Sequence, residues 1–166
     1  MENSLIIAGV DGSQNSLLAA GVAARMSTLI GARLGLVHVL DEPVLGYWGG
    51  LHDRMLEDIR AEAEKTLADV AGRVLETCGT MPEILIESGL PEDAFKRVME
   101  REAGVIMVIV GRHGLAEEKR ARPLTSQLGH VAAFLAANLS VPVTCVPPDI
   151  HASQICEAIE RLRAKG

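Results

Sequence analysis

The sequence predicts a single α/β domain in which a doubly wound, five-stranded parallel sheet is covered by helices on both faces. Short apolar runs alternate along the chain with longer segments of helical period, which is typical of repeated strand–helix units. Hydrophobic residues make up 48% of the chain but aromatic residues only 2%, so the core must be built from Ala, Val, Leu and Ile. Such a core suits buried parallel strands. The 166 residues are enough for one domain with its own core.

The first half of the chain contains two predicted strands and two predicted helices. The strands are Leu5 to Val10 and Leu34 to Leu40, and the helix between them stops at Gly31. A long amphipathic helix runs from Leu51 and stops at Gly79. The apolar positions that define the two helices are Leu18, Val22, Met26 and Leu29 in the first, and Leu51, Met55, Ile59, Ala63, Leu67, Val70, Val74 and Cys78 in the second.

The third and fourth strands come from the next part of the chain. Residues 84–86 form the third strand, and Pro91 begins the helix after it, with Ala94, Phe95, Val98 and Met99 facing inward. Leu90 has no side-chain acceptor to cap this helix. Six consecutive apolar residues, 105–110, predict a fully buried fourth strand near the sheet centre.

The remaining segments complete the sheet. Residues 111–127 lack periodicity and are too polar for a core, which indicates a long loop. The fourth helix carries Leu128, Val131, Leu135 and Leu139. The last strand, 141–146, is placed at a sheet edge because Pro142 cannot donate a ladder hydrogen bond. Residues 1–147 therefore make the domain, and 148–166 are a helical extension on Ile155, Ile159 and Leu162.

Charge and composition exclude several classes of partner and location. The net charge of −6 leaves no chain-wide basic field to attract nucleic acid. No apolar run approaches the length that spans a bilayer, so we expect a cytoplasmic protein that is not bound to a membrane. Cys78, Cys145 and Cys156 have neither metal nor redox spacing, and the histidines show no ligand spacing, so no metal is expected.

Candidate functional residues follow strands one and four, because ligands of doubly wound sheets bind beyond the carboxyl ends of the strands at the switch point. Asp11-Gly12-Ser13 follows the first strand and Gly111-Arg112-His113-Gly114 the fourth. Glycines there let a backbone approach a phosphate closely, and Gly129 could close the same pocket. Structural turns are the alternative interpretation, and Asp11 can organise a turn or accept a hydrogen bond from a ribose.

These residues, with others in order along the chain, resemble the universal stress protein family. The resemblance covers about residues 4–147 and is carried by Val10-Asp11-Gly12-Ser13 with Ser16, Leu36-Val37-His38-Val39, Gly89-Leu90-Pro91, Val110-Gly111-Arg112-His113-Gly114, Leu128-Gly129-His130-Val131-Ala132 and Val141-Pro142-Val143. It implies the strand order 3-2-1-4-5, with which the crossover rule agrees. It also implies a stress-response or signalling module that binds ATP or AMP, with magnesium as a candidate companion, and pairs as a homodimer through its last strand. The nucleotide-binding residues that it implies are Asp11, Val39, Val110, Gly111, His113, Gly114, Gly129, His130 and Val131.

Two features of the sequence, one segment length and one residue type, differ from the family's Gly-x2-Gly-x9-Gly-Ser/Thr pattern. The segment 115–128 between Gly114 and Gly129 is longer than nine residues, and His130 stands where the pattern has a hydroxyl. The imidazole could donate to a phosphate, and Lys119, Arg120, Arg122, Thr125 and Ser126 could add contacts. Equally, the insertion could fill the pocket, which leaves a nucleotide-free interaction protein of the same fold as the alternative.

No catalytic residues are assigned, because no nucleophile, base and orienting group form a recognisable set. Slow ATP hydrolysis is a third alternative. Tyr47 and Trp48, which lie between glycines after the second strand, could form a lid over the adenine side or simply pack against the long helix.

Overall fold

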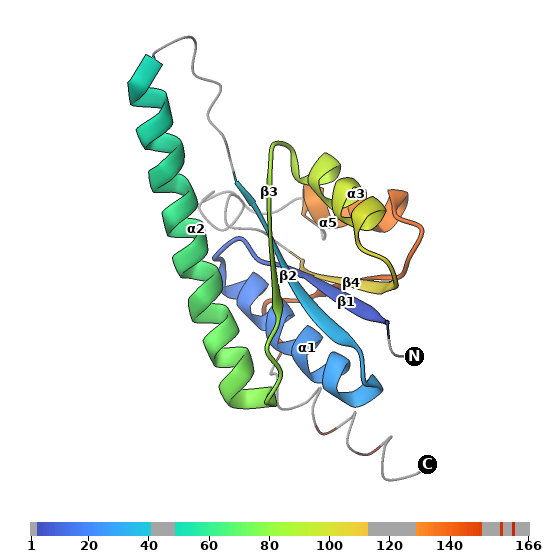
Figure 1. Cartoon of the computed structure of the whole chain (residues 1–166). Coiled ribbons are helices and arrows are strands. Elements are labelled where there is room, and N and C mark those ends of the chain that lie inside the picture. Colours follow the sequence, from blue (N-terminus) through green and yellow to red (C-terminus); the bar gives the residue numbers. More distant parts are fainter. Residues whose placement is uncertain (1–2, 41–48, 113–128, 151–156, 158–160, 162–166) are drawn as a thin grey trace.

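The computed structural model describes residues 3–40, 49–112, 129–150, 157 and 161. Its elements are β1 (Leu5–Gly9), α1 (Gln14–Ile30), β2 (Arg33–Leu40), α2 (Gly49–Cys78), β3 (Glu83–Ser88), α3 (Pro91–Arg101), β4 (Val105–Gly111), α5 (His130–Asn138) and β5 (Val143–Val146). All strand pairs are parallel, and the strands lie in the order β3-β2-β1-β4-β5 (Figure 1). The predicted fold class and strand order are confirmed. Most of the predicted loop 111–127 and of the C-terminal helix lies outside the described residues.

Alternate residues of each strand supply the two halves of the core. Helices α1 and α2 cover one face of the sheet, and α3 and α5 cover the other (Figure 1). On β1, Ile6 and Ala8 belong to the cluster under α1 and α2, whereas Leu5 and Ile7 belong to the cluster under α3 and α5. All four are fully buried. Because successive strand residues point to opposite faces, a strand buried on both sides reads as a continuous apolar run.

Local signals determine where α1 begins and ends. Ser13 is the N-cap, and its hydroxyl accepts a hydrogen bond from the Ser16 amide at 3.0 Å. Gly31 ends the helix with φ of 70°, a left-handed conformation that glycine adopts without steric cost. The start of α1 is therefore held directly beside the end of β1.

The long helix α2 extends beyond the sheet that it covers (Figure 1). Its 30 residues span about 45 Å, whereas the eight residues of β2 span about 26 Å. The predicted apolar face is buried from Ala63 to Val74, but Met55 is 40% exposed and Ile59 only half-buried. The apolar face predicted for this helix is therefore covered from Ala63 onward, whereas Met55 remains open to solvent.

The predicted burial of the whole run 105–110 is also corrected. Val108, Ile109 and Val110 are buried, but Ile106 is 38% exposed, and Val105 and Met107 are half-buried. The cause is a bulge: Leu5 pairs with Val105 and the next residue of β1 pairs with Met107. An extra residue in one strand is left unpaired and breaks the alternation of faces. As predicted, β4 is an interior strand, between β1 and β5.

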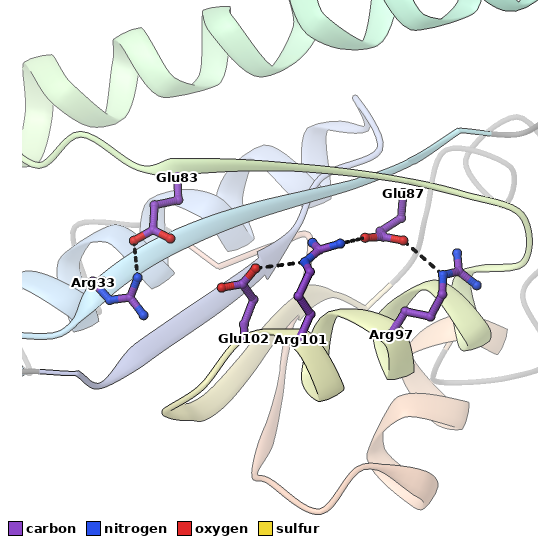
Figure 2. A network of polar contacts seen from close by, with 6 residues as sticks. All are labelled: Arg33, Glu83, Glu87, Arg97, Arg101 and Glu102. Carbon is purple, nitrogen blue, oxygen red and sulfur yellow. Dashed lines mark hydrogen bonds and ion pairs between the residues drawn. The ribbon is translucent and has the colours of Figure 1, made fainter.

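An ion-pair network fastens the edge strand β3 to α3 (Figure 2). Glu87, whose side chain is only 9% exposed, accepts from Arg97 Nε at 3.1 Å and from Arg101 Nη1 at 2.6 Å. Glu83, earlier on β3, pairs with Arg33 of β2 at 2.6 Å. Glu83 and Glu87 of β3 are thus each matched by a guanidinium, which satisfies the requirement that buried charges be paired.

Candidate functional site

The switch point of the sheet lies between β1 and β4. These two strands are neighbours, but the helices that follow them, α1 and α5, cover opposite faces (Figure 1). In doubly wound sheets, ligands bind at such a point, beyond the carboxyl ends of the two strands. Of the residues predicted from the sequence after these two strands, Asp11, Gly12, Ser13, Gly111 and Arg112 are described, and they lie at this same edge.

Asp11 organises the turn at the end of β1. Its Oδ1 accepts a hydrogen bond from the Ser13 amide at 3.0 Å, and its own amide donates to the Ser16 hydroxyl at 3.3 Å. Gly12 between them has φ of 82°. The turn-forming interpretation of Asp11 is thus observed directly, and the residue is exposed at the edge of the sheet.

A histidine on β2 supports the same turn. His38 Nδ1 donates to the Val10 carbonyl at 2.7 Å, and the Val10 amide donates to the Val37 carbonyl at 2.8 Å. The carbonyl oxygen can only accept, so the proton of this hydrogen bond is on Nδ1. His38 was one of the residues that carried the family resemblance, but no role was predicted for it. In the structure its hydrogen bond holds the backbone of Val10, the residue before Asp11.

Asn15 was missed by the sequence analysis, although it is central to this edge. It is 1% exposed, and its Nδ2 donates to the Val146 carbonyl at the end of β5, at 2.9 Å. A Cβ at Gly111 would lie 3.0 Å from the backbone carbon of Asn15. Gly111 is therefore needed for close packing of β4 against α1. The available signal was an asparagine in the first turn of the helix that follows the Asp11-Gly12-Ser13 turn.

The end of β4 is joined to the start of α5 by hydrogen bonds. The Gly129 amide donates to the Arg112 carbonyl at 2.7 Å, and the Arg112 amide donates to the Val146 carbonyl at 2.8 Å. Gly129 therefore lies beside Arg112, the residue that follows Gly111. The amides of Arg112 and Gly129 already donate to carbonyl groups of the protein, so they do not serve as donors to a ligand. The next amides along the chain belong to the first turn of α5.

The first turn of α5 contributes donor potential at this edge. The first amides of an α-helix have no partner within the helix, and the N-cap Gly129 has no side chain to accept from them. The partial positive charge of a helix N-terminus adds to this potential. Here His130 is the first helical residue and Val131 the second.

The side chain of His130 meets a carboxylate. Its Nδ1 lies 3.1 Å from Oε1 of Glu92, in the first turn of α3. The His130 side chain is 83% exposed and that of Glu92 only 16%. Sequence analysis missed Glu92, because nothing local marks a glutamate in the first turn of a helix as part of a site.

The remaining predicted site residues are three valines in the described part of the chain and two residues outside it. Val39 is half-buried near the end of β2 and pairs in register with Glu87 of β3. Val110 is buried on β4, and Val131 packs against the core under α3 and α5. His113 and Gly114 lie outside the described residues, together with Lys119, Arg120, Arg122, Thr125, Ser126, Tyr47 and Trp48.

The described residues contain neither a cluster of metal ligands nor a helix that could span a membrane. No group of three or more His, Cys, Asp or Glu side chains among them is arranged to hold a metal ion. No helix in the described part of the chain combines the length and the apolar character needed to cross a membrane.

Solved structures share this architecture. Universal stress protein UspA from Lactobacillus plantarum is 16% identical, covers 88% of this chain and 99% of its own, and superposes with a TM-score of 0.71. A universal stress protein in complex with cAMP is 23% identical, with 90% and 100% coverage and a TM-score of 0.63. The universal stress protein from Archaeoglobus fulgidus in complex with dAMP is 19% identical, with 88% and 99% coverage and a TM-score of 0.61. No curated protein matches the chain significantly.

The sequence itself matches the model of the universal stress protein family over residues 3–147. This match spans all five strands and the four helices between them. The match and the strand order agree with the resemblance found along the sequence. The chain therefore belongs to the universal stress protein family.

Proposed function

We propose that this chain binds an adenine nucleotide, ATP or AMP, across the carboxyl ends of β1 and β4 and acts as a homodimeric stress-response or signalling module. The observation that carries the proposal is the hydrogen bond from Gly129 to the Arg112 carbonyl, which brings the first turn of α5 to the end of β4. Two members of the family were solved with cAMP and dAMP, which supports an adenine nucleotide as the ligand.

The ligand contacts of the proposal combine the geometry of this edge with the residue roles that the family resemblance implies. The phosphates lie against the first-turn amides of α5 at His130 and Val131, where helix N-termini bind anions. The adenosine lies toward Asp11 and the end of β2 at Val39, with Val110 and Gly111 as the floor. His113 and Gly114 complete the phosphate loop in this proposal, and magnesium is a candidate companion of a triphosphate.

Calorimetric titration of ATP, ADP and AMP, each with and without magnesium, tests the proposal. We expect at least one nucleotide to bind with Kd below about 1 mM, a threshold of roughly 4 kcal/mol. Gly114→Val should abolish this binding while the melting temperature stays close to that of the parent, because a branched side chain blocks close approach of the phosphates. Mass spectrometry of small molecules extracted from freshly purified protein gives an independent answer. Absence of binding in both assays would favour the nucleotide-free interaction protein.

The homodimer is proposed through β5, which is an edge strand in the described sheet. The Pro142 carbonyl accepts from Val108 of β4, and the Val146 carbonyl accepts from Arg112, the residue after β4. In a strand of period two, the backbone groups of Val143 and Cys145 therefore point away from the sheet. Pairing with a second copy would satisfy them. Thr144 is exposed on this strand, and Thr144→Lys should convert the dimer to a monomer in light scattering, since edge lysines oppose strand pairing. A monomeric parent would contradict the proposal.

A further inference from the structure

The pair formed by His130 and Glu92 lies where the phosphates of the proposed ligand would bind. It joins the first turns of α3 and α5, with 3.1 Å between Nδ1 and Oε1. Glu92 is largely withdrawn from solvent, whereas the imidazole is exposed. A carboxylate at this point opposes an anionic ligand, because like charges in a partly buried site repel one another.

The other charged groups near this pair have partners of their own among the described residues. On α3, Asp93 pairs with Lys96 at 3.9 Å, and Lys96 also lies 5.3 Å from the ring centre of Phe134 on α5. At the end of β4, the Arg112 guanidinium reaches Asp149 at 3.4 Å. Within α5 the remaining residues carry no charge, and β5 contains none. Among the described residues, Glu92 is a carboxylate in direct contact with the His130 imidazole.

We propose that this pair makes nucleotide binding dependent on protonation of His130, an inference that rests on the proposed function. Histidine side chains change charge between about pH 5 and 8. With His130 protonated, the imidazolium neutralises Glu92 and donates to the phosphate through a charge-assisted hydrogen bond. With His130 neutral, the charge of Glu92 faces the phosphate without compensation. The protonated state therefore binds the nucleotide more tightly, and binding takes up a proton.

The test is calorimetric titration of cAMP into the full chain at pH 6.0 and at pH 8.0. A phosphodiester keeps a single charge over this range, whereas a phosphate monoester loses a second proton near pH 6. We expect the Kd of the parent to be about fivefold lower, or more, at pH 6.0. Titrations at pH 7 in two buffers of different ionisation enthalpy should show net proton uptake on binding.

Two variants separate the roles of the pair. His130→Ser keeps a hydrogen-bond donor without a titrating group, so its Kd should be the same at both pH values and no proton should be taken up. Glu92→Gln removes the repulsion, so its affinity at pH 8.0 should exceed that of the parent and its pH dependence should be smaller. Melting of each variant without ligand, at both pH values, verifies that the fold is intact.

The outcomes are distinguishable. Binding of cAMP by the parent with Kd values within twofold at pH 6.0 and 8.0 overturns the proton dependence and leaves the proposed function standing. An unchanged pH dependence in His130→Ser overturns the assignment to His130. If cAMP does not bind, AMP is the second probe. His130→Ser lacks the imidazole, so any pH dependence of AMP binding that this variant retains comes from the phosphate of AMP. Failure of both ligands at both pH values overturns the proposed function and this inference together.

Discussion

Glu87 is a buried charged residue, with 8% of its surface exposed. Burial alone would raise the pKa of its carboxyl group. Hydrogen bonds from Arg101 and Arg97, together with their positive charges, outweigh burial and hold the pKa below the ordinary value of 4.5. Because the folded-state pKa is the lower one, the stabilisation that Glu87 provides is complete above pH 4.5 and is lost as the pH falls through the folded-state pKa.

The first prediction concerns Glu87→Gln. At pH 7 this variant should lower the free energy of unfolding by about 1–3 kcal/mol, because the charge-assisted hydrogen bonds to both guanidinium groups are weakened. The difference from the parent should shrink toward zero as the pH is lowered to about 3. Urea denaturation at both pH values measures it. Glu100→Gln, at an exposed position of α3, the helix that carries Arg97 and Arg101, is the control and should change little. A pH-independent difference would contradict this account.

Asp11 allows its structural role to be separated from its charge. Asp11→Ala removes the oxygen that accepts from the Ser13 amide, so it should destabilise the fold by about 1 kcal/mol in thermal melting. Asp11→Asn keeps an oxygen in the same place and should melt close to the parent. If asparagine is as destabilising as alanine, the charge of Asp11, and not the turn, is what stabilises this edge.

At the scale of the elements, β4 shows how one strand combines a buried and an exposed end. Ile109, in its second half, is 0% exposed, whereas Ile106, at the bulge three residues earlier, is 38% exposed. The bulge breaks the register with β1 just where the strand begins. Two isoleucines of one apolar run are therefore in very different surroundings.

The same substitution at both positions tests this difference. Ile109→Asp should be destabilising by about 4 kcal/mol or more, because it places an unpaired charge between two buried layers. Ile106→Asp should cost about 1 kcal/mol, since its side chain can reach water. Chemical denaturation of the two variants gives the comparison. Similar losses at both positions would mean that the bulge is not present in solution.

At the scale of the whole molecule, the segment after β5 returns to the body of the domain. Ile150 is half-buried and packs against the core cluster under α1 and α2, whereas Asp149, before it, is exposed. We propose that the extension 148–166 belongs to the same cooperative unit as residues 1–147. Its predicted helical residues Ile155, Ile159 and Leu162 lie outside the described part of the chain.

Two truncations test the contribution of this contact. A chain that ends at Pro148 should be less stable than one that ends at Ile150 by about 1–2 kcal/mol, because it loses the burial of one isoleucine side chain. The ion pair of Asp149 with Arg112 should add little, since Asp149 is exposed. Ile150→Ala in the full chain should reproduce most of the loss in urea denaturation. Equal stability of the two truncated chains would show that Ile150 is not part of the core.

Most of the fold could be predicted because its signals are local. Apolar runs locate the strands, periodic positions locate the helices, and glycines such as Gly31 locate the helix ends. The errors arose where tertiary geometry intervenes. The bulge at Ile106 and the overhang of α2 at Met55 depend on how one element matches the length and register of its neighbour. A periodic pattern within one segment contains no information about that match.

By itself the sequence determined the family, the order of the elements and the edge of the sheet at which the candidate site lies. Only the tertiary structure decided which distant groups meet there. Asn15 reaches the Val146 carbonyl across 131 residues of chain, and Glu92 meets His130 from another helix. Such contacts are set by the packing of α1, α3 and α5 on the sheet, and local patterning carries no information about the distance between two helix ends. The chemical character of the site was therefore visible only once the helices were in place.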